Sequence, residues 1–212
     1  MKKELFVLFA AFAFVFGGCS GCGYNEGPVD PDANTSVVTF QQELNGYNGT
    51  ADAFVSSTTP DGYWGADVYL WVQKSGENDM LWSFIRFDLS YLMPGTVIRS
   101  AHLTLYPDTG ALPVDIDVWR TGAGWEEANI TFNNLPNINP VKFTSFQLNN
   151  VDPVTLSLPV QMVQEWVNNQ SINYGIMLSK SGAPSADSAR FHSANTNDKE
   201  YAPKLVVRYE QY

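Results

Sequence analysis

Short segments in which hydrophobic and polar side chains alternate recur along the chain from Val37 onward, with clusters of Gly, Pro, Asn and Asp between them. In one segment Val68, Leu70 and Val72 share one parity, and residues 81–88 show the same period after a polar turn at residues 74–79. Because successive side chains of a strand point to opposite faces, this alternation predicts two strands joined as a β-hairpin. The spacing of the other segments favours an antiparallel sandwich or barrel.

Further strands are expected at residues 101–106, 114–119, 176–178, 189–192 and 205–209. One stretch has helical spacing, since Val160, Val163 and Val167 lie on one helix face between Pro159 and Asn168. The sequence therefore predicts an all-β fold with one short helix, which covers an edge of the sandwich. The expected centre of its core is formed by Ile85, Phe87, Leu103 and Leu105.

The N-terminus has the pattern of an export signal. Lys2 and Lys3 precede an apolar run at residues 5–16, which is too short to span a bilayer but is typical of a secretory signal. The run ends at Gly17-Gly18-Cys19, which resembles the lipobox of bacterial lipoproteins. This resemblance implies that Cys19 is the lipidated first residue of the mature chain. The alternative is a disulfide between Cys19 and Cys22 in a secreted protein.

These features divide the chain into a signal peptide at residues 1–18, a flexible tether at residues 19–36 and a β-sandwich domain at residues 37–212. The tether offers few side chains to bury. We expect an exported, membrane-anchored lipoprotein at the outer membrane or cell surface. Its contact with the membrane is expected to be the lipid anchor alone.

The charge of the chain narrows the class of partner. The 212 residues include 12 Lys and Arg against 22 Asp and Glu, which gives a net charge of −10. Removal of residues 1–18 takes away two lysines and one glutamate, so the exported part stays acidic. The electrostatic field of such an acidic chain repels phosphate groups, so nucleic acid is not an expected partner.

The residues of the domain do not form a pattern typical of catalysis. The sequence contains no Gly-x-Ser-x-Gly or His-Glu-x-x-His, and both cysteines precede residue 37. Glu126 and Glu127 are adjacent, so they point apart on a strand and are a poor acid-base pair. His102 and His192 are expected to have structural roles. The chain is therefore predicted not to be an enzyme.

Several separate segments share an order and spacing. Residues 84–90 read Phe-Ile-Arg-Phe-Asp-Leu-Ser, residues 125–127 read Trp-Glu-Glu and residues 130–136 read Ile-Thr-Phe-Asn-Asn-Leu-Pro. With Leu70-Trp71-Val72 and residues 203–207, they resemble the DNRLRE domain, also described as carbohydrate-binding module family 96. Ile85 and Phe132 depart from the family pattern, where Leu and Trp are usual.

The resemblance covers about residues 50–210 and implies a jelly-roll-like antiparallel β-sandwich that binds polysaccharide. Alginate is among the ligands associated with the family. The resemblance also implies that Glu127 accepts backbone hydrogen bonds in a turn. Trp125 and Trp166 are expected to be buried.

The candidate glycan-binding residues are aromatic side chains around the first hairpin, because sugars stack their C–H faces on such rings. If Leu70 and Val72 face the core, Tyr69 and Trp71 face away, as Trp82 does on the partner strand. Arg86 would offer polar contacts or pair with Asp88. The predicted site is Tyr63, Trp64, Tyr69, Trp71, Trp82 and Arg86. The alternative is that a loop or the helix covers these rings.

Our leading hypothesis is a non-catalytic polysaccharide-binding domain, and the alternative is a structural or adhesive surface domain without a glycan site. The partner is an alginate-like or a neutral glycan, since an acidic protein repels a polyuronate unless basic residues cluster or calcium bridges the two. No cofactor and no metal site are predicted, although Asp115, Asp117, Asp187 and Asp198 leave a structural calcium open.

Overall fold

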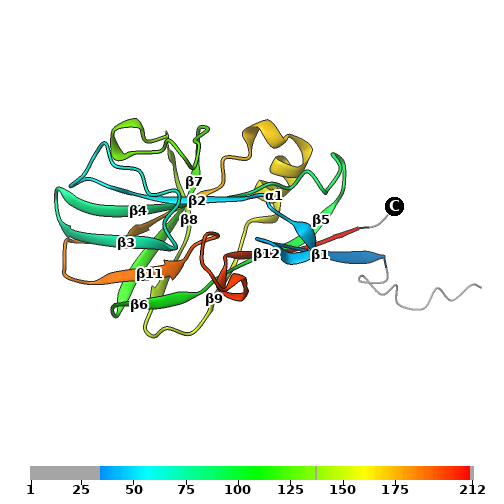
Figure 1. The fold of residues 1–212 in the computed structure, drawn as a ribbon. Helices are drawn as coiled ribbons and strands as arrows, with labels where there is room; N and C mark the ends of the chain where they lie inside the picture. The colour runs from blue at the N-terminus through cyan, green and yellow to red at the C-terminus, as the bar shows by residue number, and fades with distance from the viewer. Residues whose placement is uncertain (1–33, 137, 211–212) are drawn as a thin grey trace, which may run out of the picture. The chain divides into compact units, whose positions relative to one another are not determined.

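The computed structural model describes residues 34–136 and 138–210 (Figure 1). The predicted signal peptide, Cys19 and nearly all of the predicted tether lie outside these residues. The strands are β1 (Thr35–Gln41), β2 (Thr50–Ser56), β3 (Tyr69–Gly76), β4 (Asp79–Phe87), β5 (Ile98–Leu105), β6 (Pro107–Ala111), β7 (Val114–Thr121), β8 (Ile138–Leu148), β9 (Val154–Ser157), β10 (Ile176–Lys180), β11 (Ser188–His192) and β12 (Lys204–Glu210). The helices are α1 (Val160–Asn168) and the 3₁₀ helices η1 (Leu44–Gly46), η2 (Phe132–Asn134), η3 (Gln170–Ile172) and η4 (Lys199–Tyr201).

Two antiparallel sheets form a jelly-roll-like sandwich, as predicted. The smaller sheet has the order β1-β12-β5-β9. The larger sheet has the order β6-β11-β3-β4-β10-β7-β8, and β2 pairs with β4. The chain passes repeatedly from one sheet to the other, for example at Tyr106 between β5 and β6. Neighbouring strands are therefore often distant in sequence, as with β3 and β11.

The predicted hairpin is present, with β3 and β4 paired from Gln73 and Leu81 to Gly76 and Asp79. The parity is also as expected, because Leu70 and Val72 are buried while Tyr69 and Trp71 are partly exposed. Because side chains alternate along a strand, Leu70 and Val72 lie in the core, and Tyr69 and Trp71 lie on the outer face of the larger sheet.

The core between the sheets contains the four residues predicted for its centre. Ile85, Phe87, Leu103 and Leu105 are between 0% and 6% exposed and belong to one hydrophobic cluster. Trp166 from α1 joins the same cluster. Burial of these apolar side chains removes a large hydrophobic surface from water, which stabilises the sandwich without a disulfide in the described residues.

The predicted helix forms as α1, over Val160–Asn168. Its buried face consists of Met162, Val163, Trp166 and Val167. Gln164 on its partly exposed side accepts from the backbone N–H of Ile98 and donates to the carbonyl of Thr96, at 2.9 and 2.8 Å. These bonds attach α1 to the start of β5, and Figure 1 shows the helix beside that strand. No helix in the described part of the chain combines the length and the apolar character needed to cross a membrane.

A second hydrophobic cluster lies on the outer face of the larger sheet. It consists of Ala53, Val55, Phe84, Trp125, Ile130 and Met177. The first three and Met177 come from β2, β4 and β10, whereas Trp125 and Ile130 come from the connection between β7 and β8. Residues 122–136 therefore fold over the outer face of the sheet. Trp125 is buried as predicted, but in this outer cluster and not between the two sheets.

Candidate functional site

The structure brings Tyr69 and Trp71 together with residues from a strand more than 100 positions away in the chain. In the register of β11 and β3, Arg190 lies opposite Trp71 and His192 lies opposite Tyr69. All four side chains are partly exposed on the outer face of the larger sheet. Paired side chains on one face of antiparallel strands stand close enough to contact each other.

Arg190 is held over the two aromatic rings. Its guanidinium carbon lies 4.0 Å from the centroid of the Tyr69 ring and 5.2 Å from that of Trp71. Its Nε donates to Oδ2 of Asp108 on β6 at 2.8 Å, and the two side chains form an ion pair. Both are one quarter exposed. The stacked, forked geometry fixes the guanidinium, since arginine combines ring contact with directed hydrogen bonds.

His192 extends this arrangement toward the C-terminal part of the chain. Its ring centroid lies 5.6 Å from that of Tyr69 and 5.3 Å from that of Tyr201, which stacks on it with an interplanar angle of 28°. Its Nδ1 lies 3.1 Å from the hydroxyl of Thr196. We call Tyr69, Trp71, Asp108, Arg190, His192 and Tyr201 the arginine-aromatic surface.

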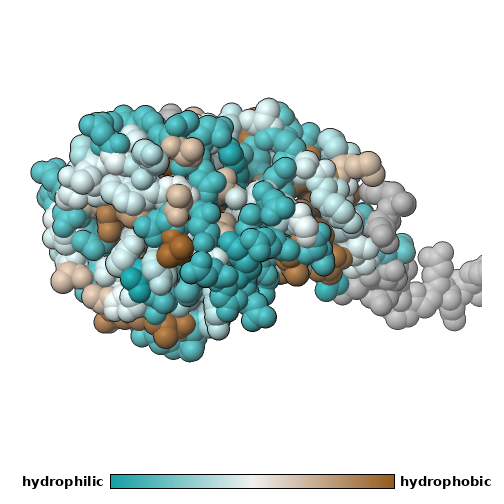
Figure 2. All heavy atoms as spheres, in the orientation of Figure 1, coloured by the Kyte–Doolittle hydropathy of each residue, from teal (hydrophilic) through white to brown (hydrophobic). Residues whose placement is uncertain are grey.

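The face of the molecule in view in Figure 2 carries no broad hydrophobic area. Pale and teal atoms cover most of the region over β3, β4 and β11, and the brown atoms form small separate patches. An outer face of this kind offers ring faces and hydrogen-bonding groups together. Such a mixture is typical of surfaces that bind amphipathic ligands.

Trp82 and Arg86, which were predicted to continue the aromatic face on β4, lie in a different environment. Trp82 is partly exposed and packs against Phe132, with ring centroids 5.4 Å apart. Arg86 donates to the carbonyl of Trp125 at 3.2 Å, and its guanidinium lies 5.2 Å from the Trp125 ring centroid. Residues 122–136 thus cover the part of the sheet where both side chains emerge. The sequence-based alternative, in which a loop covers these side chains, therefore applies to Trp82 and Arg86.

The ion pair expected between Arg86 and Asp88 is not formed, so that expectation was wrong. Asp88 instead accepts the backbone N–H of Ser90 through Oδ1, at 2.8 Å. The two side chains share a strand parity, but the strand ends at Phe87 and Asp88 already begins the following turn.

Tyr63 and Trp64 lie in the loop between β2 and β3. Trp64 stacks on Phe54 of β2, with ring centroids 4.9 Å apart and an interplanar angle of 18°. Tyr63 is 64% exposed. Asn133 fastens this loop to residues 122–136, because its side chain donates to Asp61 and its backbone N–H donates to the carbonyl of Pro60.

β2 carries a buried carboxyl group, that of Asp52. Asp52 is 1% exposed, and its Oδ2 accepts the backbone N–H of Ala194 at 2.7 Å. Burial raises the pKa of Asp52 from its ordinary value of 3.8 to about 8, and the nearby Glu127 carboxylate adds to the rise. Glu127 itself accepts from the backbone N–H of Asp52 and from the Asn195 amide, at 3.4 and 3.3 Å. Its partial burial raises the pKa of Glu127 as well.

This network joins three parts of the chain and has a structural role. Glu127 accepts a backbone hydrogen bond, as the family resemblance implies, although the donor belongs to a strand and not to a turn. Asn195 also donates to the carbonyl of Gly65, at 2.8 Å. The two carboxyl groups therefore hold β2, the β7–β8 connection and the loop after β11 together.

The acidic residues considered for calcium have other partners. Lys142 donates to Asp117 at 2.9 Å, and Gln147 donates to Asp115 at 3.0 Å. Asp187 accepts from the hydroxyl of Ser185. Across residues 34–136 and 138–210, no three His, Cys, Asp or Glu side chains gather in a geometry that would hold a metal ion.

Sequence reasoning missed Asp108, Arg190, His192 and Tyr201 as parts of one surface. A signal was present, since Arg190 and His192 flank the apolar Phe191 just as Tyr69 and Trp71 flank Leu70. Alternation shows that each pair faces outward, but it does not show which strands are neighbours. The pairing of β11 with β3 supplies that information.

Comparison with solved structures finds a similarity to the mud crab tombus-like virus structure. It has 14% sequence identity and a TM-score of 0.30, and covers 97% of this chain and 94% of the viral chain. No curated protein matches the sequence. A family model does match, over residues 44–209, and it is that of carbohydrate-binding module family 96. Among the described residues, this match includes every strand after β1 apart from Glu210 at the end of β12, and every residue of the arginine-aromatic surface. The chain belongs to carbohydrate-binding module family 96.

Proposed function

We propose that this protein is a non-catalytic module that binds polysaccharide through the arginine-aromatic surface. The observation that carries the proposal is the position of Arg190 over Tyr69 and Trp71, with His192 and Tyr201 continuing the row of rings. Membership of a carbohydrate-binding family supports the ligand class. Of the aromatic residues predicted from the sequence, this proposal keeps Tyr69 and Trp71 as ligand contacts. It assigns the polar contacts to Arg190 and not to Arg86.

The chemistry of the surface suits a sugar chain. Ring faces accept the C–H faces of pyranose units, and the N–H groups of Arg190 and the carboxylate of Asp108 bond to hydroxyl groups. Because Arg190 and Asp108 neutralise each other, the surface itself carries little net charge. This favours a neutral glycan over an alginate-like polyuronate, which the acidic chain repels.

We also propose, from the sequence, that the module is exported and anchored through lipid on Cys19. This would hold a weak binding surface at the cell envelope, where one polysaccharide chain meets many copies. Linked binding events raise the overall avidity without any new contact. The DNRLRE domain resemblance agrees with such a surface role.

The direct test is binding of the purified full-length chain to a glycan array that holds neutral polysaccharides and alginate. The best hit is then measured by calorimetry with Trp71→Ala, and with Tyr91→Ala as a control for loss of an exposed aromatic ring. We expect a dissociation constant between about 1 μM and 1 mM, weakened at least about tenfold by Trp71→Ala and unchanged by Tyr91→Ala. Equal binding by both variants would reject this surface, and an array without a hit would favour the structural or adhesive domain.

A further inference from the structure

A polar cavity lies apart from the arginine-aromatic surface, at the start of β2 and the end of β4. Its volume is about 400 Å³, within the range of ~300–1,000 Å³ that is usual for small-ligand sites. Thr50, Arg86, Asp88, Glu127, Gln170 and Asn173 line it. These residues come from β2, from β4 and the residue that follows it, from the β7–β8 connection and from the segment between α1 and β10. The cavity is therefore built by parts of the chain that only the fold brings together.

Three side chains that line the cavity, those of Thr50, Gln170 and Asn173, have a polar atom without a partner among the described residues. Asn173 is 5% exposed and donates through Nδ2 to the carbonyl of Phe87 at 2.7 Å, but its Oδ1 accepts no hydrogen bond. The Nε2 of Gln170 has no acceptor. A buried polar atom without a partner lowers stability by about 1–3 kcal/mol, so such atoms usually have an unseen partner. One unpaired acceptor and one unpaired donor here match a hydroxyl group, which both donates and accepts.

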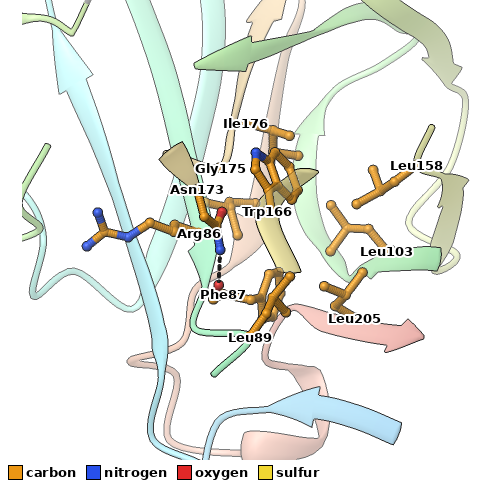
Figure 3. Close-up of a pocket in the computed structure, with 11 residues that line it drawn as sticks. Arg86, Phe87, Leu89, Leu103, Leu158, Trp166, Asn173, Gly175, Ile176 and Leu205 are labelled. Carbon is orange, nitrogen blue, oxygen red and sulfur yellow. Dashed lines mark hydrogen bonds between the residues drawn. The ribbon is translucent and has the colours of Figure 1, made fainter. Parts of the chain in front are cut away.

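Arg86 is directed away from the apolar side of this region. Figure 3 shows its side chain extending to the opposite side of the backbone from Leu89, Leu103 and Leu205, while Asn173 reaches the carbonyl of Phe87. The Arg86 side chain thus extends away from these leucines and lines the polar cavity. Its bond to the carbonyl of Trp125 holds it in place.

The charges of the cavity select among ligands. Arg86 supplies one positive charge, and Asp88 and Glu127 supply two carboxylates. An anionic sugar would meet a net negative lining and would be repelled. The carboxylates accept hydrogen bonds from neighbouring hydroxyl groups, and the amides of Gln170 and Asn173 complete a set that is typical of polyol recognition.

We propose that this cavity is a second carbohydrate site, which takes one neutral pyranose unit with adjacent free hydroxyl groups. It does not depend on the arginine-aromatic surface, because the two share no residue. Gln170 supplies a donor that the protein does not otherwise use, since its Nε2 has no acceptor, and the Asp88 carboxyl is exposed although its Oδ1 accepts from Ser90.

The test uses the purified full-length chain in detergent and saturation-transfer NMR. The probes are methyl β-glucopyranoside, methyl α-mannopyranoside and methyl β-glucuronide. We expect millimolar binding of at least one neutral glycoside and weaker or no binding of the glucuronide. Gln170→Ala should weaken that binding about fivefold, the loss of about one hydrogen bond, and Asp88→Asn should weaken it similarly.

The controls are Gln161→Ala, an exposed glutamine on α1, and Trp71→Ala on the other surface; both should leave glycoside binding unchanged. Thermal melting of each variant identifies any loss of folding, and Gln170→Ala removes an amide that has no partner to lose. Three results would overturn the proposal: no neutral glycoside binds, the glucuronide binds more tightly, or Trp71→Ala abolishes binding that Gln170→Ala retains. Failure of polysaccharide binding at Trp71 would leave this cavity unaffected.

Discussion

Asp52 on β2 and Ala194 after β11 are joined by a 2.7 Å hydrogen bond from the Ala194 backbone N–H to Oδ2 of the Asp52 carboxyl. The carboxyl is buried, and its other oxygen has no partner among the described residues. Lys199 lies nearby and donates to the carbonyl of Ala194 at 2.9 Å. Its positive charge favours the charged form of Asp52, whereas the negative charge of Glu127 disfavours that form. Burial dominates and raises the pKa of Asp52 to about 8.

This raised pKa predicts a loss of stability as the pH increases. Below about pH 4 Asp52 is protonated in both the folded and the unfolded chain. Between its ordinary pKa of 3.8 and about 8 the unfolded chain releases the proton while the folded chain keeps it, so the contribution to the free energy of unfolding falls. Asp52→Asn keeps the acceptor for Ala194 and removes the titration. In thermal unfolding between pH 5 and pH 9, the variant should lose less stability than the wild type.

The matched control for this prediction is Glu77→Gln, which neutralises an exposed carboxyl in the turn between β3 and β4. Its melting curves should follow those of the wild type at each pH. Parallel curves for Asp52→Asn and the wild type would show that Asp52 titrates at an ordinary pKa.

Trp82 and Trp71 should respond differently to truncation. Trp82 packs against Phe132 in the outer hydrophobic cluster, so Trp82→Ala should lower the free energy of unfolding by about 2 kcal/mol or more. Trp71→Ala removes a ring that contacts Arg190 on an open face and should lower it by less than about 1.5 kcal/mol. Chemical denaturation measures both values. A larger loss for Trp71 than for Trp82 would show that Trp71 supports the fold.

Truncation in the main core should be costly. Phe87→Ala and Leu103→Ala each leave a cavity between the sheets, and each should lower the free energy of unfolding by about 2–5 kcal/mol. Val37→Ala, at a position that is 56% exposed on β1, should change it by less than about 0.5 kcal/mol. Urea denaturation of the three variants tests the core assignment, which fails if their midpoints coincide.

Gly175 should tolerate no side chain. Its φ is +75°, and a Cβ atom there would lie 2.1 Å from the carbonyl oxygen of Ile85. Gly182 has a similar φ of +77°, but a Cβ atom there would meet nothing within 4 Å. Gly182→Ala should therefore lower stability by about 1–2 kcal/mol, the cost of the left-handed backbone alone. Gly175→Ala should lower it by clearly more, and equal melting temperatures for the two variants would contradict the close approach to β4.

The proposed anchor gives a prediction that concerns localisation alone. Cys19→Ser should move the protein from the membrane fraction to the soluble fraction, because each methylene of a buried acyl chain contributes about 0.8 kcal/mol to membrane binding. Cys22→Ser should leave the distribution unchanged. Fractionation with immunodetection makes the measurement, and a Cys19→Ser variant that stays in the membrane would reject lipidation at this residue.

The sequence by itself determined the local features of the fold. Alternation with a period of two predicted β3, β4 and the inward direction of Ile85, Phe87, Leu103 and Leu105, because side-chain direction along a strand depends only on neighbouring residues. Helical spacing after Pro159 predicted α1 for the same reason. The alternation around Leu70 also predicted that Tyr69 and Trp71 point outward.

Tertiary structure alone decided which outward residues meet and which are covered. Trp82 and Trp71 have the same local pattern, yet residues 122–136 fold over one, and Arg190 from β11 lies beside the other. Arg86 was predicted to serve the aromatic face, but the β7–β8 connection turns it toward a polar cavity shared with Gln170 and Asn173. The physical reason is that strand order and loop packing depend on contacts between residues far apart in the chain. Alternation constrains the face that a side chain occupies and carries no information about the neighbour on that face.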